Sequence, residues 1–323
     1  MINKRSASFL LMIALLAAGV SGCGKRAEKT INTDLQIVCT FLPVYMMTRN
    51  IADNVTGIQV SILVSPAIGC PHDYSLTPAE VHRLEQADVL VINGLGMETF
   101  LEGIPAARRS GLRIIDASAG LTLVLDDIAV EIGSAAEHVA ESPHNGMPHP
   151  KNPHAWVSPI RAAEMTLYIA QQLAEIRPEA ADRLLENAQI YASALDSLRR
   201  EFDALFFSAP NKKIVTFHRA FDYFAKDFGL EVSGVIESEP GVEPSAKNLA
   251  ELAGKIKLAR PAAIFSEPQY SNKLALMLSA ETGVPVYQLD PAASGGTDRR
   301  SYLNTMASNL AVLRQALSVV AEK

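Results

Sequence analysis

Long basic runs are absent from this sequence of 323 residues, and so are long apolar runs after its N-terminus. The formal net charge of -6 and the isoelectric point of about 5.7 give no electrostatic footprint for nucleic acid. After residue 20 no apolar segment approaches bilayer-spanning length, so we expect no membrane-spanning helix there. A His-Glu-x-x-His motif is missing as well, which argues against the usual helix of a zinc hydrolase.

Cysteine is scarce too, with three residues in the whole chain. The first, Cys23, follows the small residues of Val20 to Gly22, and this junction resembles the lipobox of bacterial lipoproteins. Ahead of it, a basic start and an apolar run of about a dozen residues, Phe9 to Val20, are typical of a signal peptide. We expect a signal peptide over 1–22, lipid attachment at Cys23 and a polar tether over 23–34. The alternative is a plain secretory signal followed by a chance cysteine.

The other two cysteines are Cys39 and Cys70. An exported protein sits in an oxidising compartment, which permits a disulfide between them. Two buried thiols are an equally good interpretation, because a sequence does not give the Cα separation that a disulfide needs.

The first half of the remaining chain alternates β-branched runs with helical patterns, which predicts an α/β fold with parallel strands. Thr77, Pro78 and Glu80 form the pattern of a helix start with a capping box. Ligand sites in such folds lie at the carboxyl ends of the strands. The expected elements are strands at Leu35 to Phe41, Ile58 to Val64, Val89 to Ile92 and Leu112 to Ile115, and a helix at Val44 to Asp53.

One helix of about thirty residues, roughly 45 Å long, is predicted between Pro178 and Pro210. Its apolar residues recur at alternating steps of three and four. A coiled-coil segment in a dimer is the alternative, but charge alternation beside the apolar seam is weak. We therefore expect a rigid helix over 178–208 that joins a lobe at 35–177 to a second lobe at 209–323.

The second half repeats the α/β alternation. Ser245 is the expected N-cap of one helix. About 300 residues at 48% hydrophobic content are enough for two ordinary domains. The expected elements are strands at Lys213 to Phe217, Leu230 to Val235, Ala262 to Ser266 and Pro285 to Leu289, and a final helix at Thr297 to Ala321.

Three of the seven histidines fall in one proline-rich stretch, 143–156, with His138 just upstream. Four prolines there forbid a regular helix, so the imidazoles of His144, His149 and His154 must sit on a loop. A metal site is one interpretation of this stretch, and a solvated linker is the other.

Polar residues also follow several predicted strands: His72 in the first half, and His218, Glu267 and Asp290 in the second. Three neutral imidazoles and one carboxylate, brought together from separate loops, would make a four-coordinate site suited to zinc. Taken singly, each histidine is more simply a surface or core residue. Their matching positions in the fold favour a shared site.

Seven motifs, in order, resemble those of the metal-binding lipoproteins that serve zinc and manganese ABC importers. This resemblance covers nearly the whole mature chain and implies two α/β lobes joined by a long helix, with metal ligands at His72, His154, His218 and Asp290. The motifs are Pro71-His72-Asp73-Tyr74 with Thr77-Pro78, Ala87 to Glu98, Asn152 to Trp156, His218 to Phe224, Val242 to Ser245, Phe265 to Gln269, and Leu289-Asp290-Pro291.

Within that family a histidine at the position of His218 resembles the zinc branch, whereas a carboxylate resembles the manganese branch. Imidazole is the softer donor and suits Zn²⁺, while oxygen suits Mn²⁺. Glu267 is expected to accept an N–H from an imidazole without binding the metal; the alternative is a salt bridge between lobes. Cys70, two residues before His72, could compete as a ligand. His138, His144 and His149 would form a thin accessory metal-capture loop.

The resemblance implies a receptor that captures Zn²⁺, or less favourably Mn²⁺ or Fe²⁺, outside the cytoplasm and delivers it to the permease and ATPase subunits of an ABC importer. It would be a monomer, lipid-anchored in the periplasm or at the cell surface, and not an enzyme. A zinc hydrolase is disfavoured, because a carboxylate as fourth ligand leaves no metal-bound water. A metal-carrying adhesin would share these features but would not release its ion.

Overall fold

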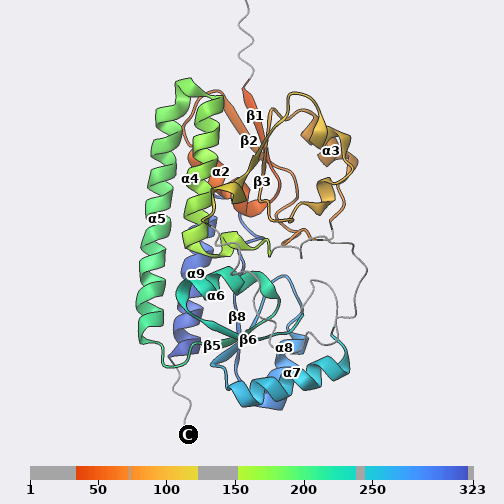
Figure 1. The fold of residues 1–323 in the computed structure, drawn as a ribbon, viewed down its shortest axis with the longest axis vertical. Coiled ribbons are helices and arrows are strands. Elements are labelled where there is room, and N and C mark those ends of the chain that lie inside the picture. The colour runs from red at the N-terminus through yellow and green to blue at the C-terminus, as the bar shows by residue number, and fades with distance from the viewer. Residues whose placement is uncertain (1–33, 73, 123–151, 238–243, 319–323) are drawn as a thin grey trace, which may run out of the picture. The chain divides into compact units, whose positions relative to one another are not determined.

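Two four-stranded sheets, both entirely parallel, frame the part of the chain that the computed structural model describes, residues 34–72, 74–122, 152–237 and 244–318 (Figure 1). Their strand orders are β2-β1-β3-β4 and β6-β5-β7-β8, so the two halves repeat one topology. All eight strands were predicted from the sequence, and their observed ends lie at most two residues from the predicted ends. The strands are β1 Leu35–Cys39, β2 Ile58–Ile62, β3 Val89–Ile92, β4 Arg113–Asp116, β5 Lys213–Thr216, β6 Glu231–Val235, β7 Ala263–Ser266 and β8 Val286–Gln288.

Several expectations from the sequence concern residues outside those ranges. They are the signal peptide over 1–22, lipid attachment at Cys23, the tether up to residue 33, and the accessory histidines His138, His144 and His149.

Two helices begin where the sequence placed their capping residues. Thr77 caps its helix, with the backbone N–H of Glu80 donating to Thr77 Oγ1 and the Glu80 carboxylate accepting from the Thr77 backbone N–H at 2.7 Å. Ser245 likewise accepts from the backbone N–H of Asn248. The α-helices are α2 Leu42–Ile51, α3 Pro78–Glu85, α4 Pro159–Ile176, α5 Ala181–Ser208, α6 Asp222–Phe228, α7 Ala246–Ala259, α8 Lys273–Thr282 and α9 Ser301–Leu317.

The long helix predicted from Pro178 is α5, whose 28 residues follow a 3-10 turn at Pro178–Ala180. Its apolar stripe is buried as the periodicity indicated, including Leu184, Leu195 and Phe202. It packs against α2 and α4 in the first half and against α6 and α9 in the second (Figure 1). The two lobes therefore share one continuous helix.

The last helix starts later than expected, at Ser301 rather than Thr297. The backbone carbonyls of Thr297 and Arg299 accept hydrogen bonds from Arg49 and Asn50 of α2, at 2.5 and 3.0 Å. Those carbonyls are therefore turned toward the other half of the molecule instead of entering a helix. Side chains about 250 positions away are invisible to local periodicity.

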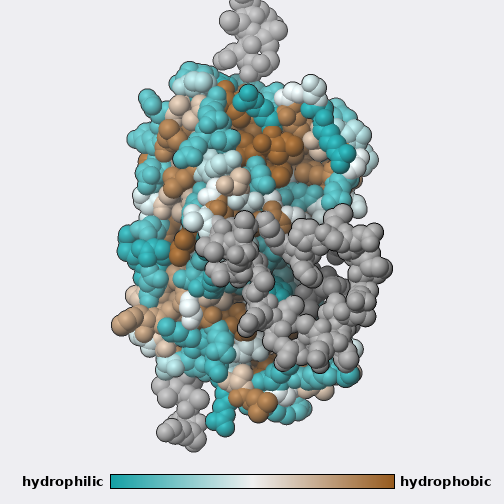
Figure 2. Space-filling view, in the orientation of Figure 1, coloured by the Kyte–Doolittle hydropathy of each residue, from teal (hydrophilic) through white to brown (hydrophobic). Residues whose placement is uncertain are grey.

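Within the described residues no helix is long and apolar enough to cross a membrane. On the face drawn in Figure 2, hydrophilic and hydrophobic residues are interspersed. The apolar core is instead internal and includes fully buried Trp156 together with Phe202, Phe206 and Phe224.

Candidate metal centre

Four side chains that could bind a metal come together from three distant loops: those of Cys70, His72, His154 and His218. One donor atom from each lies within 4.8 Å of the other three. The Nε2 atom of His154 is 3.0 Å from Nε2 of His72 and 3.2 Å from Nε2 of His218. The structure thus unites the three histidines that the sequence placed at loop positions.

The loop between β2 and α3 carries Cys70 and His72. The backbone N–H of His72 donates to the carbonyl of Cys70 at 3.0 Å, which closes a tight turn around Pro71. The hydroxyl of Thr99 donates to the His72 carbonyl at 3.2 Å and ties this loop to the segment after β3. The capped start of α3 then fixes where the loop ends.

His154 lies just before a 3-10 turn at Ala155–Val157 that leads into α4. The side-chain amide of Asn93, at the end of β3, donates to the Pro153 carbonyl at 2.9 Å. The imidazole of His154 lies against the indole of Trp156, with ring centroids 5.1 Å apart. The indole N–H donates to the Pro291 carbonyl at 2.8 Å, so the His154 segment is attached to both halves of the protein.

Asn152 determines which nitrogen of His154 carries the proton. Its Oδ1 faces both the backbone N–H and Nδ1 of His154, at 3.0 and 2.8 Å. Its Nδ2 donates to the Arg219 carbonyl and to Asp222 Oδ2, which fixes the amide orientation. Because Oδ1 can only accept, Nδ1 of His154 is the donor and Nε2 keeps its lone pair.

The same reasoning applies to His218, which follows β5. Its Nδ1 lies 2.6 Å from Oε1 of Glu267, at the end of the neighbouring strand β7. A carboxylate accepts, so Nδ1 of His218 donates, and in the neutral imidazole that can bind a metal the lone pair is then on Nε2. This is the contact expected for Glu267. Both side chains are buried, with 1% and 0% of their area exposed.

The Nε2 atoms of His154 and His218 therefore face each other across 3.2 Å, and both carry a lone pair when the two imidazoles are neutral. Two such lone pairs repel each other, whereas a cation between them would attract both. Tetrahedral zinc with bonds of 2.0–2.1 Å would hold its nitrogen ligands about 3.3 Å apart. The distances of 3.0 and 3.2 Å are close to that value.

Burial shapes the acid–base behaviour of this centre. It lowers the pKa of His154 well below the usual imidazole value, and the neighbouring His218 and His72 lower it further. Burial also raises the pKa of the Glu267 carboxyl, and its hydrogen bond to His218 opposes part of that rise. The Cys70 thiol has a raised pKa, first from burial and then from the charges of Glu267 and Asp290. A neutral His154 is ready to bind a cation.

Asp290, the carboxylate expected to be the fourth ligand, does not join the group of mutually close donor atoms. Its Oδ1 accepts from the backbone N–H of Ala292 at 2.8 Å. Ala292 has the left-handed backbone angle φ 58°, which is costly for a residue with a Cβ. One Asp290 oxygen therefore stabilises the turn after β8.

Cys39 and Cys70 are free thiols in the structure, so the disulfide considered from the sequence is not formed in it. Cys39 is fully buried in β1, whereas Cys70 lies in the loop beside His72. His82, which lies outside this centre, is exposed on α3 and contacts Glu85 and Gln86.

Reasoning from the sequence assigned no role to the side chain of Asn152, which orients the imidazole of His154. Its spacing two residues before His154 was the available signal, since Asn side chains commonly bond to the backbone two residues on. Cys70, which the sequence marked as a competing ligand two residues before His72, lies in the same group of donor atoms as the imidazoles.

Residues 37–316 match the protein family described as "ZnuA: Zinc-uptake complex component A periplasmic". The chain belongs to this family. The match covers both sheets and all four donor residues of the centre.

Individual relatives of this zinc-uptake family member are similar along its length. The zinc-binding lipoprotein AdcA of Streptococcus pneumoniae (strain ATCC BAA-255 / R6) is 31% identical over 311 residues, covering 95% of this chain and 60% of AdcA. The high-affinity zinc uptake system protein ZnuA of Bacillus subtilis (strain 168) is 28% identical over 329 residues, 99% of each chain. The chain thus spans about three fifths of the length of the AdcA relatives.

A solved structure shows the same fold. The SBP FpvC of Pseudomonas aeruginosa, in complex with Ni²⁺, aligns with a TM-score of 0.74 and 28% identity, covering 90% of this chain and 99% of FpvC. The architecture of two parallel-sheet lobes and one long helix is therefore shared with a solute-binding protein.

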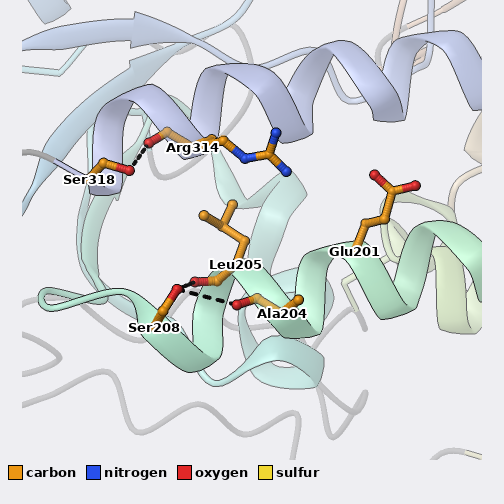
Figure 3. Close-up of a pocket in the computed structure, with 6 residues that line it drawn as sticks. All are labelled: Glu201, Ala204, Leu205, Ser208, Arg314 and Ser318. Carbon is orange, nitrogen blue, oxygen red and sulfur yellow. Dashed lines mark hydrogen bonds between the residues drawn. The ribbon is translucent and has the colours of Figure 1, made fainter.

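A pocket of this zinc-uptake family member lies between α5 and the end of α9 (Figure 3). Figure 3 shows the side chains of Glu201 and Arg314 extending from the two facing helices. The lining offers no imidazole or thiol, so it is no counterpart to the metal centre. The lining residues are Glu201, Ala204, Leu205, Ser208, Arg314 and Ser318.

Proposed function

We propose that the protein is an extracytoplasmic receptor that captures a divalent transition metal, Zn²⁺ in the first place, and delivers it to an ABC importer. The observation that carries this proposal is that the Nε2 atoms of His154 and His218 face each other, 3.2 Å apart. Their tautomers are set by Asn152 and Glu267, so the centre is preorganised for a cation.

The ligand chemistry favours zinc over manganese or iron. His72, His154 and His218 would supply three imidazole nitrogens, which suit zinc. Manganese prefers carboxylate and water oxygen. Asp290 as an additional oxygen ligand remains a prediction, and a manganese or iron receptor of the same type is the alternative.

A receptor role is favoured over catalysis and over structural binding. His154 and His218 are 3% and 1% exposed, and together with His72 and Cys70 they offer four donor atoms, which would leave no open position for an activated water. A structural metal site, as in an adhesin, would unfold when the metal is chelated. A receptor would release zinc to a chelator and stay folded.

The family and the N-terminal sequence support the delivery of zinc to an importer and the attachment of the protein to a membrane by a lipid anchor. The family is described as a component of a zinc-uptake complex, which supports partnership with permease and ATPase subunits. A relative is named a lipoprotein, which supports acylation at Cys23 after removal of residues 1–22. The anchored protein would act as a monomer in the periplasm or at the cell surface, through lobes at 35–177 and 209–323.

Calorimetry with Zn²⁺ tests the proposal. The purified protein should bind one equivalent tightly, and His218→Ala should lose most of the affinity. His82→Ala is the matched control, because His82 is exposed on α3 and outside the centre. Unchanged affinity in the His218→Ala variant would sink the assignment.

A further inference from the structure

Cys70 is the fourth member of the group of converging donors. We propose that its Sγ binds the metal directly and makes the centre a three-nitrogen, one-sulfur site. This inference rests on the proposed function and concerns how that same centre selects its metal.

The geometry of the donor atoms supports a direct bond. The sulfur and the three imidazole nitrogens lie within 4.8 Å of one another. In tetrahedral zinc with Zn–S of about 2.3 Å and Zn–N of about 2.0 Å, sulfur and nitrogen would be about 3.6 Å apart. Small side-chain movements would therefore complete the coordination.

The backbone around Cys70 holds the sulfur beside the imidazoles. The hydrogen bond from the His72 N–H to the Cys70 carbonyl, 3.0 Å long, makes one turn carry both side chains. Two donors two residues apart on a closed turn reach one ion without rearranging the loop. A bound metal deprotonates a coordinating thiol, so a protonated Cys70 in the metal-free protein is no obstacle.

The competing fourth donor is Asp290, which has another task. One of its oxygens holds the N–H of Ala292 in a left-handed turn. Asp290 lies outside the group of mutually close donors, whereas Cys70 lies inside it. The carboxylate is close enough to act on the Cys70 thiol through its charge.

Sulfur in the site would change its metal preference. Thiolate is a soft ligand that favours Zn²⁺ and other thiophilic ions, while Mn²⁺ favours oxygen. With Cys70 as ligand the protein should discriminate against Mn²⁺ more strongly than its three histidines alone would.

Cobalt spectroscopy tests the bond directly. Co²⁺ takes the place of Zn²⁺, and a cobalt–thiolate bond gives a near-ultraviolet charge-transfer band that imidazole and carboxylate ligands lack. The reduced wild-type protein should show this band. Cys70→Ala and Cys70→Ser should lose it, while Asp290→Asn should keep it.

Cys39→Ala is the matched control, since Cys39 is a free thiol buried in β1 outside the centre. It should keep the band. Zinc binding should weaken by more than about tenfold in both Cys70 variants, because even residues behind the ligands contribute that much. Circular dichroism shows whether each variant is folded.

The outcomes separate the two proposals. Tight metal binding by the wild type without a thiolate band, or a band that survives in folded Cys70→Ala, would overturn the sulfur ligand and leave the receptor intact. A wild-type protein that binds neither Co²⁺ nor Zn²⁺ would overturn the receptor itself.

Discussion

Nδ1 of His218 lies 2.6 Å from Oε1 of Glu267, and both residues sit at the carboxyl ends of neighbouring parallel strands. The second carboxylate oxygen accepts from Gln269 Nε2 at 2.9 Å. Glu267 therefore orients the imidazole, raises its basicity and is itself held in place. The pair connects the second sheet to the metal centre.

Replacing Glu267 by Gln should weaken zinc binding by about 10- to 100-fold, because a neutral amide orients the imidazole but supports the bound cation less well. Calorimetry measures the change. Glu281→Gln, on the exposed face of α8, is the control and should bind zinc like the wild type. Equal affinity in the two variants would show that Glu267 does not support the metal.

Zinc affinity should fall as the pH is lowered through and below about 6.5, because imidazole ligands must be neutral. His154 should contribute little to that fall, since burial and the nearby His218 and His72 keep its pKa well below the usual value. Zinc titrations between neutral and acidic pH measure the dependence. A flat affinity profile would contradict imidazole ligation.

Because of the buried carboxyl of Glu98, the free energy of unfolding should decrease as the pH rises from about 4.5 to about 7. Burial raises the pKa of this carboxyl from the usual 4.5 to about 7, so the folded state holds a proton that the unfolded state has lost. Stability then falls with rising pH across that window, by up to about 3 kcal/mol.

Urea unfolding at several pH values checks this contribution. Glu98→Gln stays neutral and should flatten the wild-type dependence over that window, whereas Glu102→Gln, exposed a few residues away, should not. Identical pH profiles for wild type and Glu98→Gln would refute the role of Glu98. The carboxylate accepts from Thr40 and from the backbone N–H groups of Asn93 and Gly94, so the Gln variant also loses some stability throughout.

Arg161→Ala should destabilise the protein by about 3 kcal/mol, because it leaves the Asp227 carboxylate buried without its partner. Arg161 of α4 donates to both oxygens of Asp227 of α6, at 3.0 and 2.7 Å, and the Asp227 side chain is 7% exposed. Denaturant unfolding measures the loss. Arg183→Ala breaks an exposed pair with Glu186 and should cost less than about 1 kcal/mol.

Zinc binding should change the relative orientation of the lobes only modestly. The helix α5 packs on α2 and α4 as well as on α6 and α9, so bending between the lobes would break contacts along its length. Solution scattering with and without Zn²⁺ should give nearly equal radii of gyration. A large domain closure would contradict a rigid connecting helix.

Local patterns in the sequence were sufficient for most of the secondary structure. The capping box at Thr77 and Glu80 marked the start of α3, and a three-four apolar spacing marked α5. The start of α9 was wrong by four residues, because Arg49 and Asn50 of α2 hold the preceding backbone carbonyls. Periodicity registers contacts within an element and misses hydrogen bonds between distant ones.

The sequence by itself determined which residues are candidates for metal chemistry: three histidines at loop positions, with Glu267 expected behind one of them. Only the tertiary structure decided how they meet. His72 and His154 are 82 positions apart, and His154 and His218 are 64 apart, yet their Nε2 atoms come within 3.0 and 3.2 Å. The loop after β2, the segment before α4 and the carboxyl end of β5 meet there, although they belong to different parts of the chain.

The structure also decided what stands beside the histidines. Cys70 joined the donor group, while one oxygen of Asp290 was committed to the turn at Ala292. Asn152 and Glu267 accept from the Nδ1 atoms of His154 and His218, whose Nε2 atoms face each other. Residue types fix the available ligands, but proton positions and distances depend on partners that only the folded chain brings into contact.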